Sequence, residues 1–159
     1  MTADGLISLL NTLKIEVASE SSVIIGKEAK LLEEDMKKRI FEKGLNSFDS
    51  SIGVYMSSKW VDKRAARGLQ TGFVDLKFSG ELRQSFTTKN KSTKNEATLF
   101  FSDSKNAEKA NDQEILQGLK AGTDRMDIFD PSKKEIDKLT QSVENSLDKL
   151  VEDIFTKFQ

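Results

Sequence analysis

The sequence contains neither cysteine nor histidine, and its 159 residues include a single proline. Without cysteine the chain has no disulfide framework and no thiolate nucleophile. Without histidine it lacks the usual general base near neutral pH, the commonest transition-metal ligand and every Ser-His or Cys-His pair. These absences exclude the enzyme classes that depend on such groups.

Motifs for phosphate, calcium and membranes are missing as well. The sequence has no glycine-rich phosphate loop and no Asp-x-Asp-x-Asp-Gly calcium loop. Neighbouring carboxylates, such as Glu33 with Glu34 and Glu152 with Asp153, are expected on solvated faces of helices. No apolar run approaches the roughly 20 residues of a membrane span, and the N-terminus lacks the basic region of a signal peptide. We therefore predict a non-enzymatic protein, made in the cytoplasm, that needs no cofactor and has no membrane partner.

The length suits a single domain that spans residues 1–159. Hydrophobic residues form 36% of the chain and charged residues 32%. This polar balance is typical of long helices that each keep one face in water. It is too apolar for a chain that stays disordered.

The N-terminal part is expected to form two helices. A polar stretch at 19–22 separates a helical segment within residues 1–22 from a longer helix over 23–43. Gly44 stands where a left-handed residue would end the second helix. Both segments place apolar residues at helical spacing: Leu6, Leu10, Leu13 and Val17, then Ile25, Ala29, Leu32, Met36 and Ile40.

The centre of the chain carries the strand signals. Residues 45–72 are interpreted as an extended arm or loop, with a short helix as the alternative for 55–61. We predict a small antiparallel sheet within about residues 73–102. Its strands are expected at 73–78, after 86 and at 97–102, with a short helical turn at 81–86. A polar turn at 90–95 would give the last two strands an exposed basic tip.

The last third is expected to be helical. Residues 103–122 predict one or two short helices, and 124–129 a linker or edge strand. The C-terminal helix is predicted over 131–158, with Asp130 or Ser132 as its cap and Glu135 completing a capping box. Its wide apolar stripe indicates either core packing or a seam between subunits. Helices, then strands, then a helix indicate an α+β fold.

Positive charge is concentrated in the centre. Nine basic and three acidic residues lie within 59–94, so this segment has a net charge of +6 while the rest of the chain has −7. Such a segment often meets an anionic partner, although acidic helices of the same chain could also balance it. The residues predicted to contact a partner or DNA are Lys59, Trp60, Lys63, Arg64, Arg67, Lys89, Lys91 and Lys94.

One phrase in this region resembles a known family. It reads Val-Asp-Leu at 74–76, Ser-Gly-Glu-Leu at 79–82 and Ser85, and it follows a Lys/Arg run at 63–67. It is similar to the middle of neck and tail-completion proteins of tailed bacteriophages. Arg125 and Phe129 stand in place of the family's Arg-Pro-Phe phrase, without its proline. The order of a long helix, a hairpin and a C-terminal helix is also similar.

This resemblance implies a virion protein with an α+β fold and a small antiparallel sheet packed by the long helices. It implies a ring at the head–tail connector or tail terminus. The partners would be other copies of the chain and neighbouring portal, connector or tail proteins, with nonspecific contact with DNA in the lumen.

Two alternatives remain. The first is a cytoplasmic module that binds nucleic acid without sequence specificity, through the same basic residues and aromatic rings such as that of Trp60. The second is a hydrolase with a carboxylate-bound Mg²⁺ ion.

Overall fold

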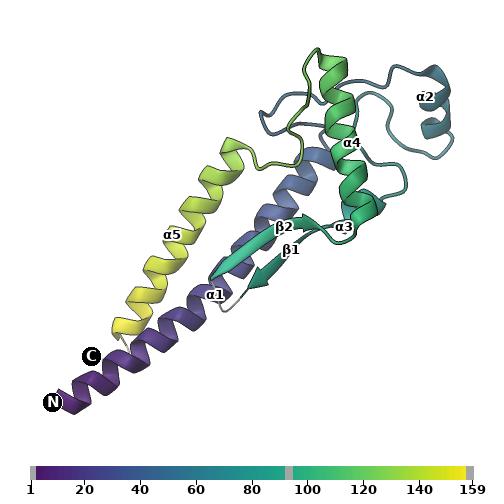
Figure 1. Cartoon of the computed structure of the whole chain (residues 1–159). Coiled ribbons are helices and arrows are strands. Elements are labelled where there is room, and N and C mark those ends of the chain that lie inside the picture. The colour runs from purple at the N-terminus through teal and green to yellow at the C-terminus, as the bar shows by residue number, and fades with distance from the viewer. Residues whose placement is uncertain (1–2, 92–94, 157–159) are drawn as a thin grey trace.

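Two long helices dominate the computed structural model, which describes residues 3–91 and 95–156. Helix α1 (Ala3–Phe41) and helix α5 (Lys133–Thr156) run antiparallel, the hairpin lies along the C-terminal half of α1, and α2 (Ser58–Ala65) lies beyond that end (Figure 1). The other elements are α3 (Glu81–Ser85), the hairpin strands β1 (Phe86–Lys91) and β2 (Glu96–Phe101), and α4 (Ser104–Ala121). The predicted α+β class is confirmed, with long helices towards both ends. None of the described helices is both long enough and apolar enough to cross a bilayer.

The N-terminal part is one helix and not two. α1 continues through residues 19–22 and has 39 residues, about 58 Å at 1.5 Å per residue. The expected break is wrong because this region meets the β-hairpin. Asn90 donates from its side-chain amide to the carbonyl of Ser22 at 3.1 Å, and Gly26 leaves room for the same amide. The helix ends as predicted before Gly44, whose φ is +64°.

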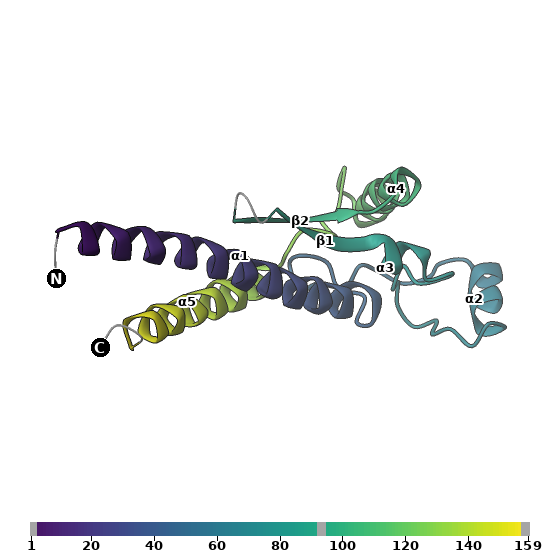
Figure 2. The same cartoon turned by 90° about the horizontal axis from the view of Figure 1, so that it is seen from below.

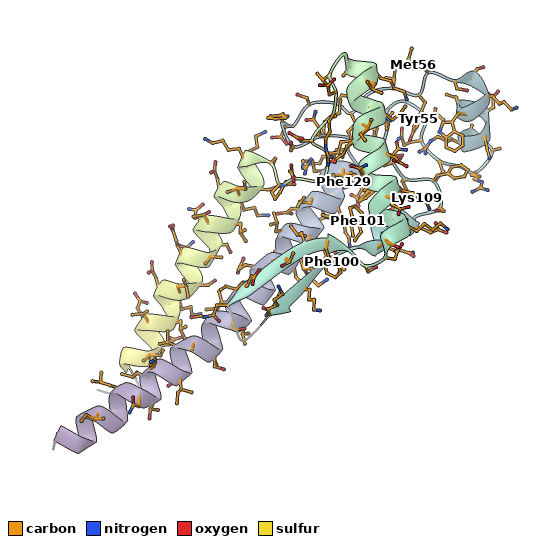
Figure 3. All side chains as sticks on the ribbon, viewed as in Figure 1. Tyr55, Met56, Phe100, Phe101, Lys109 and Phe129 are labelled. Atoms are coloured by element: carbon orange, nitrogen blue, oxygen red, sulfur yellow. The ribbon has the colours of Figure 1, made fainter. Side chains whose placement is uncertain are left out.

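The sheet is a two-stranded hairpin that covers α1. β1 pairs antiparallel with β2 from Phe86 opposite Phe101 to Lys91 opposite Glu96, as the sequence predicted for these two strands. Figure 2 shows the hairpin and α5 on different sides of α1. At the base of the hairpin, the ring of Phe101 lies 5.2 Å from that of Phe86 and 5.1 Å from that of Phe129 (Figure 3). These rings join the core that α1 supplies through Met36, Ile40 and Phe41.

The strand expected at residues 73–78 is not formed, so this prediction was wrong. The segment is an irregular loop in which Leu76 has a φ of +52°. The partial alternation has another cause. Val74 enters the core, Asp75 is buried in an ion pair, and Phe78 stacks on Trp60 at 4.6 Å between ring centroids. The side chains therefore point to separate targets and not to one sheet face.

The interpretation of residues 45–72 as an extended arm is only partly right. α2 occupies 58–65, with the Ser57 hydroxyl accepting from the Trp60 amide at 3.4 Å. After α2, the N–H groups of Arg67 and Gly68 donate to the carbonyls of Arg64 and Ala65, which continues the helix as a turn. Gly68 has a φ of +66°. This favours the short-helix alternative, shifted towards the basic run.

A buried ion pair joins the C-terminal end of α1 to the N-terminal end of α5. Arg39 of α1 donates from Nε to both carboxylate oxygens of Glu135 at 3.0 Å. Its other nitrogens reach the carbonyls of Leu45, Ile128 and Asp130. Glu135 also accepts from Ser132 N–H at 2.7 Å, which confirms the capping box. α5 begins just after Ser132 and not at residue 131.

α4 is a single helix of 18 residues that begins after the Asp103 cap. The buried carboxylate of Glu114 accepts from the backbone N–H groups of Ile128 and Phe129 and pairs with Arg125. Residues 124–129 are thus a linker fastened to α4 and not an edge strand.

Candidate functional site

The exposed residues among the predicted contacts fall into two separate groups. Lys59, Lys63 and Arg67 are exposed on or just after α2, whereas Lys89 and Lys91 are exposed near the hairpin tip. Lys94 lies outside the described residues. The hairpin tip and α2 lie at different parts of the molecule in both views (Figures 1 and 2). The structure therefore does not unite these residues into one basic face.

Arg64 is a structural residue and not a surface contact, so its assignment to a partner was wrong. Its side chain is 1% exposed. It donates from Nη2 to both oxygens of Asp75 at 2.8 and 2.9 Å, from Nε to the Gln70 carbonyl at 2.9 Å and from Nη1 to the Lys77 carbonyl at 2.7 Å. Its guanidinium also lies 4.4 Å from the centre of the Tyr55 ring. Arg64 thus holds α2 against the loop that follows it.

Tyr55 completes this buried cluster. Its hydroxyl donates to Asp75 at 2.9 Å and accepts from the Asp75 N–H at 3.3 Å. Burial raises the pKa of Tyr55 to about 12, and the nearby Asp75 charge adds to the shift. Every oxygen and nitrogen named here has a partner inside the protein. The cluster is therefore suited to fastening the α2 region and not to chemistry on a substrate.

Trp60 is not free to stack on a base in the way the nucleic-acid alternative requires. Its ring packs on Phe78, and the Lys63 ammonium lies 5.4 Å from both ring centres. The Arg67 guanidinium lies 4.2 Å from the Phe78 ring centre. These cation–π contacts use the aromatic faces within the chain. The exposed charged residues of α2 are Lys59, Asp62 and Lys63.

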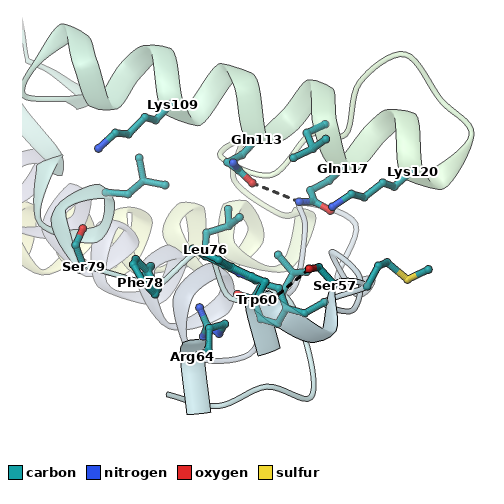
Figure 4. Close-up of a pocket in the computed structure, with 16 residues that line it drawn as sticks. Ser57, Trp60, Arg64, Leu76, Phe78, Ser79, Lys109, Gln113, Gln117 and Lys120 are labelled. Carbon is teal, nitrogen blue, oxygen red and sulfur yellow. Dashed lines mark hydrogen bonds between the residues drawn. The ribbon is translucent and has the colours of Figure 1, made fainter. Parts of the chain in front are cut away.

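A groove lies between α4 and the loops around α2, and the sequence did not predict it. Its volume is about 580 Å³, within the range of roughly 300–1,000 Å³ common for binding pockets. Figure 4 shows α4 residues on one side and Trp60, Leu76 and Phe78 on the other. The apolar lining consists mainly of Met56, Trp60, Leu76, Phe78, Leu82 and Leu116.

The groove is positively charged at its edges. Lys109 and Lys120 of α4 line it together with the neutralised Arg64, and no carboxylate of the described residues belongs to its lining. Lys109 pairs with Glu81 beside the groove at 3.1 Å. The only sequence signal for this site was the apolar group on α4 that includes Leu116 and Leu119, which are 43% and 63% exposed. Residues 103–122, which contain this group, were expected to form one or two short helices.

The carboxylate of Glu33 is buried, contrary to the expectation of a solvated face. It accepts from Lys30 and Lys37, both at 2.6 Å, and from Thr88 N–H and hydroxyl, both at 2.8 Å. Burial acts to raise the pKa of Glu33, but these hydrogen bonds outweigh it and lower the pKa from 4.5 to about 2. An ionised Glu33 thus fastens β1 to α1.

Within residues 3–91 and 95–156, no three acidic side chains gather in a way that could hold a metal ion. The buried acids Glu33, Asp75, Glu114 and Glu135 are each paired with a cation of the chain itself. A fifth buried acid, Glu28, accepts from the Ser146 hydroxyl at 3.5 Å. The arrangement therefore offers surfaces for binding: the exposed cations of α2, the hairpin tip and the groove. Searches against protein-family models, curated proteins and solved structures found no match to this chain.

Proposed function

We propose that this chain is a non-enzymatic structural protein of a tailed-bacteriophage virion, which forms or completes a ring at the head–tail connector or tail terminus. The phrase at 74–85 motivates the choice of family. The observation that carries the proposal is the arm made by α1 and α5, which leaves large apolar side chains uncovered. They are Ile7, Leu10, Ile15, Val17, Val23 and Leu31 on α1 and Ile136 and Val151 on α5.

An arm of this kind favours assembly for an energetic reason. Ile15 is 71% exposed and Leu10 is 55% exposed. Fully burying such a side chain contributes roughly 1.5–3 kcal/mol. A partner that covers several of them therefore gains several times this binding free energy. Extended apolar surface on a folded protein commonly marks a protein–protein interface. A subunit of a ring needs such surface on both of its sides.

The buried charges also support a structural role. Arg39, Arg64, Glu33 and Glu114 each join segments that are distant in sequence. None of them faces the groove unpaired, so none of these acids is left in position to activate water there. We therefore propose rigid positioning of surfaces, and not catalysis, as the task of these residues.

The mass of the purified chain in solution, together with negative-stain images, tests the proposal. Closed rings are expected, or a monomer that joins rings only when portal or tail proteins are added. A chain that stays monomeric in all of these mixtures contradicts the proposed function.

The alternative of a nucleic-acid-binding module is favoured by one observation, the exposed cations Lys59, Lys63 and Arg67 of α2. Sequence-independent binding through phosphates weakens steeply with salt. A monomer that shifts duplex DNA at physiological salt would support this alternative. If changing Lys89, Lys91 and Lys94 to Glu leaves assembly and DNA retention unaffected, the hairpin has no DNA role.

A further inference from the structure

The first 15 residues of α1, from Ala3 to Val17, extend beyond α5; we call them the arm tip. Three pairs fix how α5 lies along α1: Arg39 with Glu135, Asp35 with Lys138, and Glu28 with Ser146. At equal rise along both helices, the end of α5 at Thr156 lies beside Ala18. Among the described residues, about 22 Å of helix in the arm tip therefore has no part of α5 beside it. Figure 2 shows α1 reaching past the end of α5.

The arm tip continues an apolar stripe that borders α5 further along. Leu10, Val17, Ile24 and Leu31 recur at seven residues, and Leu31 lines a small pocket together with Leu139 of α5. Leu10 thus lies on the side of α1 that faces α5, but past its end, and is 55% exposed. Together with Ile7, Leu10 and Val17 have the spacing by which an amphipathic helix anchors in an apolar groove.

The charges at the two ends of the molecule are opposite. Beside the base of the arm tip, α5 exposes the acids Asp148, Glu152 and Asp153. Lys149 is the one exposed cation within the described residues 148–153. At the other end, Lys120 lines the groove, Lys109 pairs with Glu81 and Arg64 with Asp75, and α2 exposes Lys59 and Lys63 together with Asp62. The end of α5 is therefore net acidic and the surroundings of the groove net basic, so a contact that brings them together joins opposite charges.

We propose that the arm tip of one copy binds in the groove between α4 and α2 of the next copy. This inference rests on the proposed function and names the contact that would build the ring. The contact joins two different surfaces, so it is heterologous and forms rings when the rotation closes. A helix of this length, with one face in a groove, buries several hundred Å² on each partner, near the total of roughly 1,000 Å² that a specific interface needs.

Two lysine variants test the contact. Leu10→Lys alters the arm tip, and Leu116→Lys alters the groove, where Leu116 is 43% exposed. Lysine is a good helix former, so both variants should keep the wild-type circular dichroism spectrum and unfolding midpoint. Ile115→Lys is the matched control, because Ile115 is 39% exposed on the same helix as Leu116 but does not line the groove.

The wild type and the Ile115→Lys control are expected to self-associate. Each of the other variants should be a monomer, with self-association weakened at least ~100-fold because a charge enters an apolar contact. When the two are mixed, one intact arm tip meets one intact groove. The mixture should therefore give a 1:1 dimer and nothing larger, as measured by sedimentation or native mass spectrometry.

Other outcomes overturn the inference. Assembly that survives Leu116→Lys but not Leu10→Lys would assign the arm tip to another arm tip or to a different protein. Rings from both variants would place the ring contact elsewhere, and the proposed function would stand without this inference. A wild type that never self-associates also refutes the inference, whereas the proposed function fails only if portal or tail proteins do not recruit it either.

Discussion

Replacing Arg64 with alanine should destabilise the fold and not merely remove a surface charge. The change deletes the donor of four hydrogen bonds from a side chain that is 1% exposed. The carbonyls of Gln70 and Lys77 lose this donor. The Asp75 carboxylate is left with the Tyr55 hydroxyl and the Lys77 N–H.

The expected loss of stability is large. Removing one partner of a buried ion pair costs about 3–5 kcal/mol, a large part of the ~5–15 kcal/mol that stabilises a typical domain. With a slope of ~2 kcal/mol per molar urea, the unfolding midpoint should fall by about 2 M. Arg64→Lys should recover little of this, because an ammonium cannot donate in a fork to Asp75 and also reach both carbonyls.

Urea unfolding measured by circular dichroism tests this prediction, and the fluorescence of Trp60, the only tryptophan, reports the α2 region. Lys59→Ala is the matched control. Lys59 is exposed on the same helix, so its removal should change stability by no more than about 0.5 kcal/mol. If Arg64→Ala unfolds at the midpoint of the control and instead loses binding to a partner or DNA, the structural assignment of Arg64 is refuted.

Glu33, Tyr55 and Gly118 give three further expected outcomes. The pKa of Glu33 is lowered to about 2, so its ionised form stabilises the fold above about pH 4.5 and this stability is lost as the pH falls towards 2; Glu33→Gln should flatten the acid dependence of the urea midpoint, and an unchanged dependence would contradict the burial of this charge. Tyr55 is the only tyrosine, and its pKa is raised to about 12. Stability should therefore be lost between pH 10 and 12, with tyrosinate absorbance appearing near pH 12 in the folded chain and near pH 10 in urea. In Gly118→Ala the new Cβ would lie 2.5 Å from the Arg125 backbone, so overpacking of about 1–3 kcal/mol should exceed the ~1 kcal/mol gain in helix propensity. Thermal unfolding should show this loss, while Gly72→Ala, where nothing lies within 4 Å of the new Cβ, should be neutral.

Elements whose signal is local were predictable from the sequence. The capping box of Ser132 and Glu135 marked the start of α5 within one turn, and Gly44 marked the end of α1. β1 continues to Lys91, into the polar turn predicted at 90–95, and β2 begins at Glu96. In each case the decisive interaction joins residues close in sequence, so spacing alone carries the information.

The errors arose where distant residues decide the structure. The polar stretch at 19–22 reads as a break, but Asn90, 68 residues away, binds the Ser22 carbonyl within a continuous helix. Apolar and charged side chains alternate over residues 73–78 as they would in a half-buried strand. The charged residue Asp75 is nevertheless buried, because it pairs with Arg64. No local pattern distinguishes a carboxylate that meets a guanidinium in the core from one that faces water.

The candidate site could not be predicted for the same reason. The groove combines the apolar residues of α4 with Met56, Trp60 and Phe78 from segments well before it in the chain, so composition of any single stretch does not reveal it. The net positive charge of the central segment was visible, but its meaning was not. One of its cations, Arg64, is buried in an ion pair with Asp75, and two others, Lys63 and Arg67, lie over aromatic rings.

The charge pattern then has a different interpretation from the one that the sequence suggested. A segment with a net charge of +6 would attract DNA if its cations shared one face, but the hairpin lysines and α2 are separated. What remains near α2 and α4 is a basic border around an apolar groove, and the end of α5 supplies the opposite charge on the same chain. In the contact proposed above, this border would face the acids at the end of α5 of the neighbouring copy, and charge acts over about 10 Å at moderate salt. The acidic and basic parts of the sequence would then be two sides of one contact between copies, which the Leu10→Lys and Leu116→Lys variants test.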